Sequence, residues 1–236
     1  MTTDDEVRLE VENVDLRRLL AQAGVDAAEH KGAERLQRLL LEELHHRVKN
    51  TLATVIAITT QTLKTAASAQ EGSRAIEQRL IALGRVHDLL LQANWTSAAL
   101  SEILTTAIEP FDTGGGGRFL VQTSNIEVSS AAVLPLAMVL NELCTNAAKY
   151  GALSNESGRV EITSVVDEAG GQFRLTWTEV GGPLVSPPTR RSFGTRLIEY
   201  SFVSQLQGEA HLSFQPSGAV CILDIPLASL KPPQSN

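Results

Sequence analysis

The residue in the first third of the chain whose type and place best suit chemistry is His46, in the string Glu43-Leu-His-His-Arg-Val-Lys-Asn50. Helical residues turn by about 100° each. His46 lies two positions from both Leu44 and Val48, so on a helix it points away from the apolar stripe that these residues mark. Unprotonated imidazole is a nucleophile near neutral pH, and Asn50 lies one turn away on the same face. The spacing alone is also compatible with an ordinary solvated helix face, which is the commoner case.

A second polar group lies on one face of a helix predicted over residues 130–150. Glu142, Asn146, and then Lys149 and Tyr150 recur at spacings of one and two turns, so they share a face. An amide oxygen such as that of Asn146 suits Mg²⁺, and a lysine ammonium suits phosphate. The pattern predicts a site for a metal-bound polyphosphate, although a half-exposed helix with its polar residues outward would show the same pattern.

Glycines mark two further places where backbone could approach a ligand. Gly181 and Gly182 follow a predicted strand that ends at Glu179, and Gly194-Thr195 opens a predicted helix. Glycine at a strand end permits close backbone approach, and the amides of a helix N-terminus attract phosphate. Each signal is weak by itself because glycine-rich turns are common.

Two long amphipathic helices must position His46. Apolar residues recur every three or four positions over 27–67 and again from Ile76 to Leu90, with a turn predicted over 67–72. Two such helices with a short connection form an antiparallel hairpin, which usually pairs with a second copy as a four-helix bundle. A third helix over 97–109 could instead cover the hairpin, so the spacing leaves monomer and dimer open.

The rest of the chain predicts an α+β fold in which one sheet carries helices on one face. Strand patterns cover 118–123, 159–166, 173–179, 210–214 and 220–225, and helix patterns cover 130–150 and 195–207. The four glycines Gly114–Gly117 suggest a boundary. We divide the chain into a lead-in at 1–25, a helical domain at 26–112, a sheet domain at 113–230 and a tail at 231–236.

Composition narrows the functional classes. The chain is 43% hydrophobic with a net charge of -7 and no long run of Lys or Arg, which argues against a nucleic-acid partner. The longest apolar run, Ala131–Leu140, is shorter than the roughly 20 residues of a membrane span, and the acidic start lacks signal-peptide features. We therefore expect a cytoplasmic protein without a membrane span, with Cys144 and Cys221 as reduced, buried thiols.

Five strings, in this order, resemble sensor histidine kinases of the HWE/HisKA_2 branch over roughly residues 36–226. The strings are Glu43-Leu-His-His-Arg-Val-Lys-Asn50, Ala82-Leu-Gly-Arg-Val-His87-Asp-Leu-Leu90, Asn141-Glu-Leu-Cys-Thr-Asn146-Ala-Ala-Lys-Tyr-Gly-Ala-Leu153, Trp177-Thr-Glu179 with Gly181-Gly-Pro183, and Phe193-Gly-Thr195. Two positions depart from the branch, because Asn141 stands where its name-giving histidine lies and Ser192 stands where glycine is frequent.

The resemblance implies a fold and a set of roles. The fold would be a helical-hairpin dimerisation and phosphotransfer domain followed by a Bergerat-type (GHKL) ATP-binding sandwich. His46 would accept the phosphoryl group, Asn146 would hold Mg²⁺, and Glu142 and Lys149 would lie beside the phosphates of ATP. The remaining expected nucleotide contacts are Tyr150, Glu179 (at adenine), Gly181, Gly182, Gly194 and Thr195.

The resemblance also implies an activity and its partners. The protein would phosphorylate itself on His46 and pass the phosphoryl group to an aspartate of a response-regulator receiver domain. It would form a homodimer through the hairpin, take its input from an upstream sensor protein, swing its ATP domain about Gly114–Gly117 and close a lid at Val180–Phe193. Two alternatives stay open at this point: a phosphotransfer adaptor with a degenerate ATP domain, and a GHKL serine kinase of the anti-sigma type.

Overall fold

The first of two units of the chain, Met1–Ala57, is helical where it is described. The computed structural model describes residues 18, 34–42, 44–64, 66–93, 95–112, 117–184 and 206–232. Within the first unit, 34–42 and 44–57 are helical, as the apolar period predicts. The stripe itself remains exposed, with Leu40 at 62% and Leu52 at 56%. The first unit therefore presents an apolar helix face to its surroundings.

Helix α2 (Ala69–Gln92) leads into the core of the second unit, Ile58–Asn236. Residues 58–64 of this unit are helical and precede α2. The Ser68 hydroxyl accepts the Glu71 amide at 3.1 Å, and the Glu71 carboxylate accepts the Ala67 amide at 2.9 Å. Reciprocal bonds of this kind satisfy amides that a helix start leaves unpaired, so α2 begins inside the turn predicted over 67–72.

The segment after α2 begins with a strand, which the helical period did not predict. Ser97–Ala99 form β1, paired antiparallel with β3 (Glu127–Ser129), and α3 follows at Leu100–Ile108. The prediction of one helix over 97–109 was therefore wrong in its first turn. The partner strand lies about 30 residues further along the chain, which a local pattern does not reveal.

The second unit contains a five-stranded sheet. Its order is β2-β4-β5-β7-β6, with β2 parallel to β4 and every other pair antiparallel. The strands are β2 (Phe119–Gln122), β4 (Arg159–Asp167), β5 (Gln172–Val180), β6 (Glu209–Gln215) and β7 (Gly218–Pro226). Alternate residues of β5 point into the core, where Phe173, Leu175 and Trp177 are fully buried. The predicted strands are thus confirmed, and Trp177 is a core residue.

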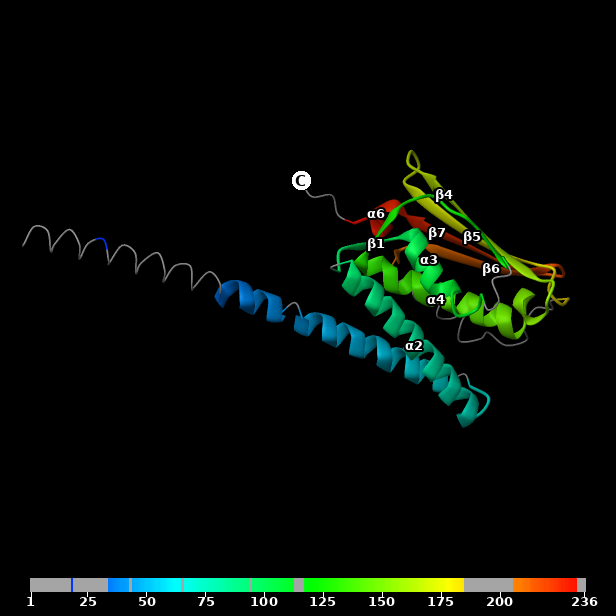
Figure 1. Cartoon of the computed structure of the whole chain (residues 1–236), viewed down its shortest axis with the longest axis horizontal. Coiled ribbons are helices and arrows are strands. Elements are labelled where there is room, and N and C mark those ends of the chain that lie inside the picture. Colours follow the sequence, from blue (N-terminus) through cyan, green and yellow to red (C-terminus); the bar gives the residue numbers. More distant parts are fainter. Residues whose placement is uncertain are drawn as a thin grey trace, which may run out of the picture. The chain divides into compact units, whose positions relative to one another are not determined.

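Helix α4 (Ser130–Lys149) lies beside α3 on one face of this sheet (Figure 1). Its apolar side, including Leu136, Leu140 and Cys144, is buried in the same cluster as the inward residues of the sheet. By length and composition α4 could cross a bilayer, yet 72% of its apolar window is buried inside the protein. The layers match the α+β arrangement expected from the sequence. A short turn of helix, η1 (Ala152–Ser154), follows α4, and α6 (Leu227–Leu230) follows β7.

One apolar core extends across the predicted domain boundary at 112/113. It contains Val86 and Leu90 of α2 and Ile103 of α3 together with the residues of α4 and the sheet. The compact unit begins at Ile58 instead. Helix α3 is apolar on the side that meets α4, so it packs with the sheet domain although it precedes the glycines. Residues 113–116 of the glycine run lie outside the described residues.

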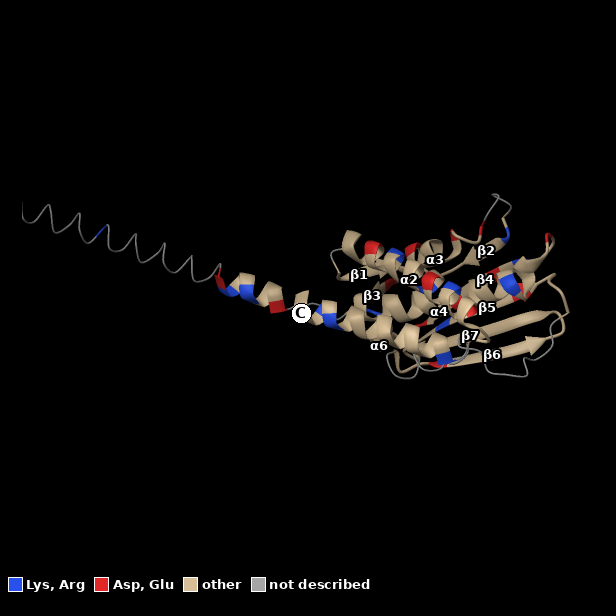
Figure 2. Cartoon of the chain, turned by 90° about the horizontal axis from the view of Figure 1, so that it is seen from below, with Lys and Arg blue, Asp and Glu red and all other residues tan. Residues whose placement is uncertain are grey.

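Charged residues of both signs are interspersed along the described helices and strands (Figure 2). Several form surface ion pairs, such as Arg159–Glu161 at 3.0 Å and Lys231–Glu168 at 2.7 Å. Exposed pairs of this kind contribute about 0–1 kcal/mol each, so we attribute the stability of the second unit to its apolar core.

Replacing Gly84 with alanine should stabilise the protein. Gly84 lies within α2, and a Cβ added there would meet no atom within 4 Å. Alanine in a helix interior is favoured over glycine by about 0.5–1 kcal/mol, which urea unfolding would measure. Gly72→Ala is the matched control, because its Cβ would lie 3.2 Å from Cβ of Ala66. An equal gain in both variants would contradict this account.

Candidate functional site

The C-terminal end of α4 gathers three of the predicted site residues. Asn146 is half-buried, while Lys149 and Tyr150 are exposed. The backbone carbonyl of Asn146 accepts the amides of Tyr150 at 2.8 Å and Gly151 at 3.1 Å, which ends the helix. Among the described residues, the side chains of Asn146 and Lys149 form no hydrogen bond or ion pair. An amide and an ammonium group are thus available at one helix end.

The turn after α4 is tied to the end of β5 by Glu179. Its Oε2 accepts the amide of Ala152 at 2.8 Å, and its Oε1 accepts the indole N–H of Trp177 at 3.4 Å. Glu179 is only 4% exposed. Burial raises the pKa of its carboxyl group, while the bonds from Ala152 and Trp177 oppose that shift. The residue predicted to meet adenine therefore also positions the turn that follows α4.

Glycines make this junction possible. A Cβ on Gly182 would lie 2.7 Å from Cα of Ala152, and one on Gly151 would lie 1.9 Å from Oε2 of Glu179. The side-chain amide of Asn155 also donates to the Gly181 carbonyl at 3.1 Å. The predicted glycines at the end of β5 thus have a packing reason to be glycine, because backbone meets backbone here.

Arg118, which no motif in the sequence marks as a site residue, lies directly before β2 and holds the same turn. Its guanidinium donates to the carbonyl oxygens of Gly158 at 2.9 Å and Ala152 at 3.1 Å, and also to that of Asn155. A planar guanidinium can serve several carbonyls at fixed angles. Arg118 and Glu179 together bind the carbonyls and an amide of 152–158, so the turn is fixed from two sides.

Glu142, predicted beside the phosphates, is buried instead. Its carboxylate accepts Nε of Arg79 at 2.6 Å and Nη2 at 2.9 Å, and Glu142 is only 3% exposed. Of the predicted polar face of α4, Glu142 therefore meets α2, whereas Asn146, Lys149 and Tyr150 stay accessible. Arg79 could have been noticed in the sequence, since it lies three residues after Ile76 and four before Leu83 in the apolar stripe of α2.

The predicted phosphoacceptor lies in the first unit. His46 and Asn50 are both exposed on the helical run that begins at residue 44. An exposed imidazole keeps the accessibility that attack on a phosphorus atom requires. Gly194 and Thr195, together with most of the predicted lid, lie outside the described residues.

His87 of α2 has a structural contact. It is half-buried, and its ring meets that of Trp95 edge-on with centroids 5.3 Å apart. Burial lowers the pKa of His87, and the nearby Asp88 opposes that shift. The packing explains this histidine without a role at the site.

The donor set at the end of α4 fits a metal that arrives with a nucleotide. Within the described ranges, no group of three or more His, Cys, Asp or Glu side chains could hold a metal ion. Mg²⁺ in nucleotide sites usually takes one or two protein oxygens and completes its shell with phosphates and waters. The Asn146 oxygen with the Lys149 ammonium nearby matches that requirement.

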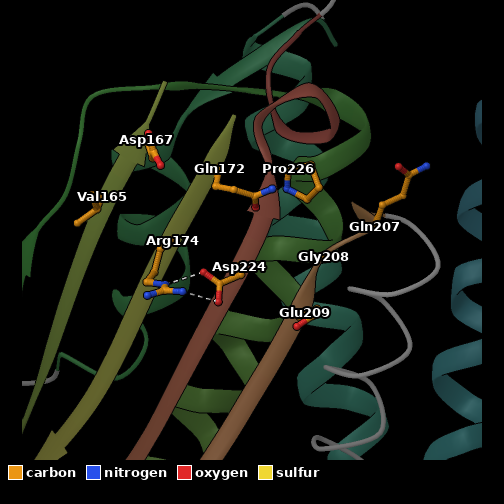
Figure 3. A pocket seen from close by; sticks show the side chains of 9 residues that line it. All are labelled: Val165, Asp167, Gln172, Arg174, Gln207, Gly208, Glu209, Asp224 and Pro226. Atoms are coloured by element: carbon orange, nitrogen blue, oxygen red, sulfur yellow. Dashed lines mark hydrogen bonds and ion pairs between the residues drawn. The ribbon is translucent and has the colours of Figure 1, made fainter. Parts of the chain in front are cut away.

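A hollow of about 560 Å³ lies elsewhere, on the sheet around β4, β5, β6 and β7 (Figure 3). Across it, Arg174 donates from Nε and Nη2 to the two carboxylate oxygens of Asp224, at 2.6 and 3.0 Å. None of the predicted site residues lines it. Because the guanidinium of Arg174 is already paired, this hollow is a weaker candidate than the end of α4.

The known proteins that are similar to this chain are named histidine kinases. The family described as HWE histidine kinase matches residues 43–125. A blue-light-activated histidine kinase of Brucella anthropi is 39% identical over 207 residues, which are 87% of this chain and 42% of that protein. The protein of the same name from Brucella ovis is 37% identical over 209 residues, 88% of this chain and 42% of its own length. The chain thus spans about two fifths of these relatives.

Two solved structures share the fold. The histidine kinase domain of the Erythrobacter litoralis EL346 blue-light-activated histidine kinase matches with a TM-score of 0.54 and 19% identity, covering 75% of this chain and 95% of that domain. The longer EL346 structure matches with a TM-score of 0.57 and 23% identity, covering 80% and 59%. The predicted order, helices followed by a sheet-based sandwich, is confirmed by this likeness.

Replacing Glu179 with glutamine should change how stability depends on pH. Burial raises the pKa of Glu179 above its unfolded value, so the native wild type loses stability as pH rises through the native pKa. Glutamine does not ionise. The free energy of unfolding of Glu179→Gln minus that of wild type should therefore grow as pH rises from about 4 towards 8, measured by urea unfolding.

Glu77→Gln, which removes an exposed carboxylate of α2, is the control and should follow wild type. A difference between Glu179→Gln and wild type that stays constant or shrinks with rising pH would show that burial does not control this carboxyl group.

Proposed function

The chain belongs to the HWE histidine kinase family, and on that premise we propose that it transfers the γ-phosphoryl group of ATP to His46 and then to an aspartate of a response-regulator receiver domain. The observation that carries the proposal is the end of α4, where Asn146 and Lys149 have no protein partner among the described residues. Glu179 and Arg118 fix the adjoining turn against β5 and β2. A site built in advance lowers the cost of orienting a substrate.

The residues of α4 would hold the triphosphate. The Lys149 ammonium would bind phosphate oxygens as a point charge, and the Asn146 oxygen would hold Mg²⁺. The metal would neutralise charge on the phosphates as the γ-phosphoryl group departs. Tyr150 and Gly181–Gly182 lie at the same junction, and with Glu179 they support a nucleotide that lies across the ends of α4 and β5.

His46 would supply the nucleophile. An unprotonated ring nitrogen forms the new N–P bond while the bond from the γ-phosphorus to its bridging oxygen breaks, and ADP leaves. The other ring nitrogen can then release its proton to water. His46 is exposed, and the Asn50 amide one turn away would hold a phosphoryl oxygen. Positioning and charge neutralisation account for most catalysis of phosphoryl transfer.

The exposed stripe of the first unit supports a homodimer. Leu36, Leu44 and Ile56 are 59%, 54% and 65% exposed. Contiguous apolar surface of this kind usually marks an interaction site, and a second copy of the same helices would cover it as a four-helix bundle. The relatives are named blue-light-activated histidine kinases. The Brucella anthropi protein is more than twice as long as its region that matches this chain. We therefore also propose that an upstream sensor protein supplies the signal that regulates this chain.

Incubating the purified protein with Mg²⁺ and γ-labelled ATP tests the proposal. Wild type should acquire acid-labile, base-stable label. His46→Ala should acquire none, because the acceptor nitrogen is gone. Asn146→Ala should label roughly 100-fold more slowly, since a misplaced phosphate costs about that factor. His45→Ala, which alters the adjacent exposed histidine, is the matched control and should label like wild type.

The alternatives give different results. Acid-stable label that survives in His46→Ala would favour a GHKL serine kinase. A wild-type protein that binds no ATP, yet accepts phosphate from another kinase on His46, would favour the phosphotransfer adaptor. Label that persists at histidine in His46→Ala would overturn the assignment of the acceptor.

A further inference from the structure

Arg79 joins three elements of the second unit through one side chain. Two of its nitrogens bind the Glu142 carboxylate of α4, and Nη1 donates to the Thr62 hydroxyl at 2.9 Å. That hydroxyl donates in turn to the carbonyl of Ile58. Arg79 is 9% exposed and Thr62 2%. The start of α2 and the helical residues 58–64 are therefore held to α4 through a buried polar network.

This network covers a residue that the family resemblance places beside the phosphates. Glu142 lies one turn before Asn146 on α4, and its side chain is the carboxylate expected beside the phosphates. Both of its oxygens are bonded to Arg79, and the residue is almost fully buried. In this arrangement Glu142 reaches neither solvent nor a nucleotide, so a role in phosphoryl transfer requires the start of α2 to move away.

The two halves of α2 are attached to the sandwich by different forces. Val86 and Leu90, in the last turns, belong to the apolar core shared with α3, α4 and the sheet. Arg79, about two turns earlier, meets α4 through an ion pair. Separating apolar surfaces exposes them to water at a cost that grows with area. The last turns of α2 therefore form the firmer attachment.

Separating the Arg79–Glu142 ion pair has a different free-energy cost from separating the apolar surfaces. Burying two charges carries a large desolvation cost, which their attraction and hydrogen bonds only offset. When the elements part fully, both charges regain hydration, whereas removing one partner alone leaves the other buried and unpaired. The contact thus favours a closed and an open arrangement over anything between them, which is the property of a two-state element.

We propose that the Arg79–Glu142 pair is a latch that holds the start of α2 over Glu142 in a resting state, and that its opening about the anchored last turns frees Glu142 for phosphoryl transfer. The latch rests on the function proposed above and adds its regulation. A signal that reaches residues 58–80 would act by biasing this one contact.

Arg79→Gln in the full chain tests the latch with two readouts. Hydrogen exchange should become faster in residues 69–80 and stay unchanged in 84–92, because only the polar attachment is lost. The initial rate of autophosphorylation should rise about fivefold or more, the scale of a typical coupling between sites. Arg74→Gln, which removes an exposed arginine of the same helix, is the control and should match wild type in both.

Glu142→Gln separates opening from chemistry. It should speed exchange over 69–80 as Arg79→Gln does, yet lower the rate, because the variant also removes the group that the latch covers. If Arg79→Gln does not fold, Arg79→Lys, which keeps the charge but loses the paired bonds, should show the same changes to a smaller degree.

Unchanged exchange in these variants, or a rate that falls in Arg79→Gln, would overturn the latch and make Arg79 a fixed support for Glu142. If wild type and all variants stay unlabelled, the proposed function fails. The exchange comparison over 69–80 against 84–92 would then decide by itself whether the contact opens.

Discussion

Helix α4 has to satisfy two opposed demands, and the rest of the second unit is arranged around them. Most of its length is apolar and must be covered, which the sheet on one side and α2 and α3 on the other achieve. Its last turn must stay open with an amide and an ammonium group available. Most of α4 therefore contributes to the core, and the side chains of Asn146 and Lys149 stay accessible near its end.

Polar contacts then fix the surroundings of that open end. In the turn over 152–158, Leu153 packs against the apolar core, and the backbone is bonded by Arg118 on one side and Glu179 on the other. Glycine is needed at 182 because a Cβ there would meet the backbone of Ala152, and at 151 because a Cβ there would meet the carboxylate of Glu179. Precision at this site therefore comes from directional hydrogen bonds and close approach, whereas stability comes from the apolar core.

Periodic patterns and short motifs in the sequence predicted the elements whose structure depends on neighbouring residues. The strands β4 to β7, helix α4 and the order of the two parts follow from local spacing, and a site at Asn146 and Lys149 stays a prediction. Spacing did not reveal the pairing of β1 with β3, nor the contact between Arg79 and Glu142, since both join residues that lie far apart in the chain. The boundary expected at 112/113 followed the glycines, but burial follows the apolar face of α3.

The parallel pairing of β2 with β4 bears on how the chain folds. Strands β4 and β5 are joined by a short turn, as are β6 and β7, so each pair can form from neighbouring residues. Strand β2 reaches β4 only through a crossover that contains α4. Contacts between distant residues form late because loop closure must come first. The pairing of Phe119 with Val160 joins residues far apart in the chain, so Arg118 can bond the turn only once this crossover has brought the two strands together.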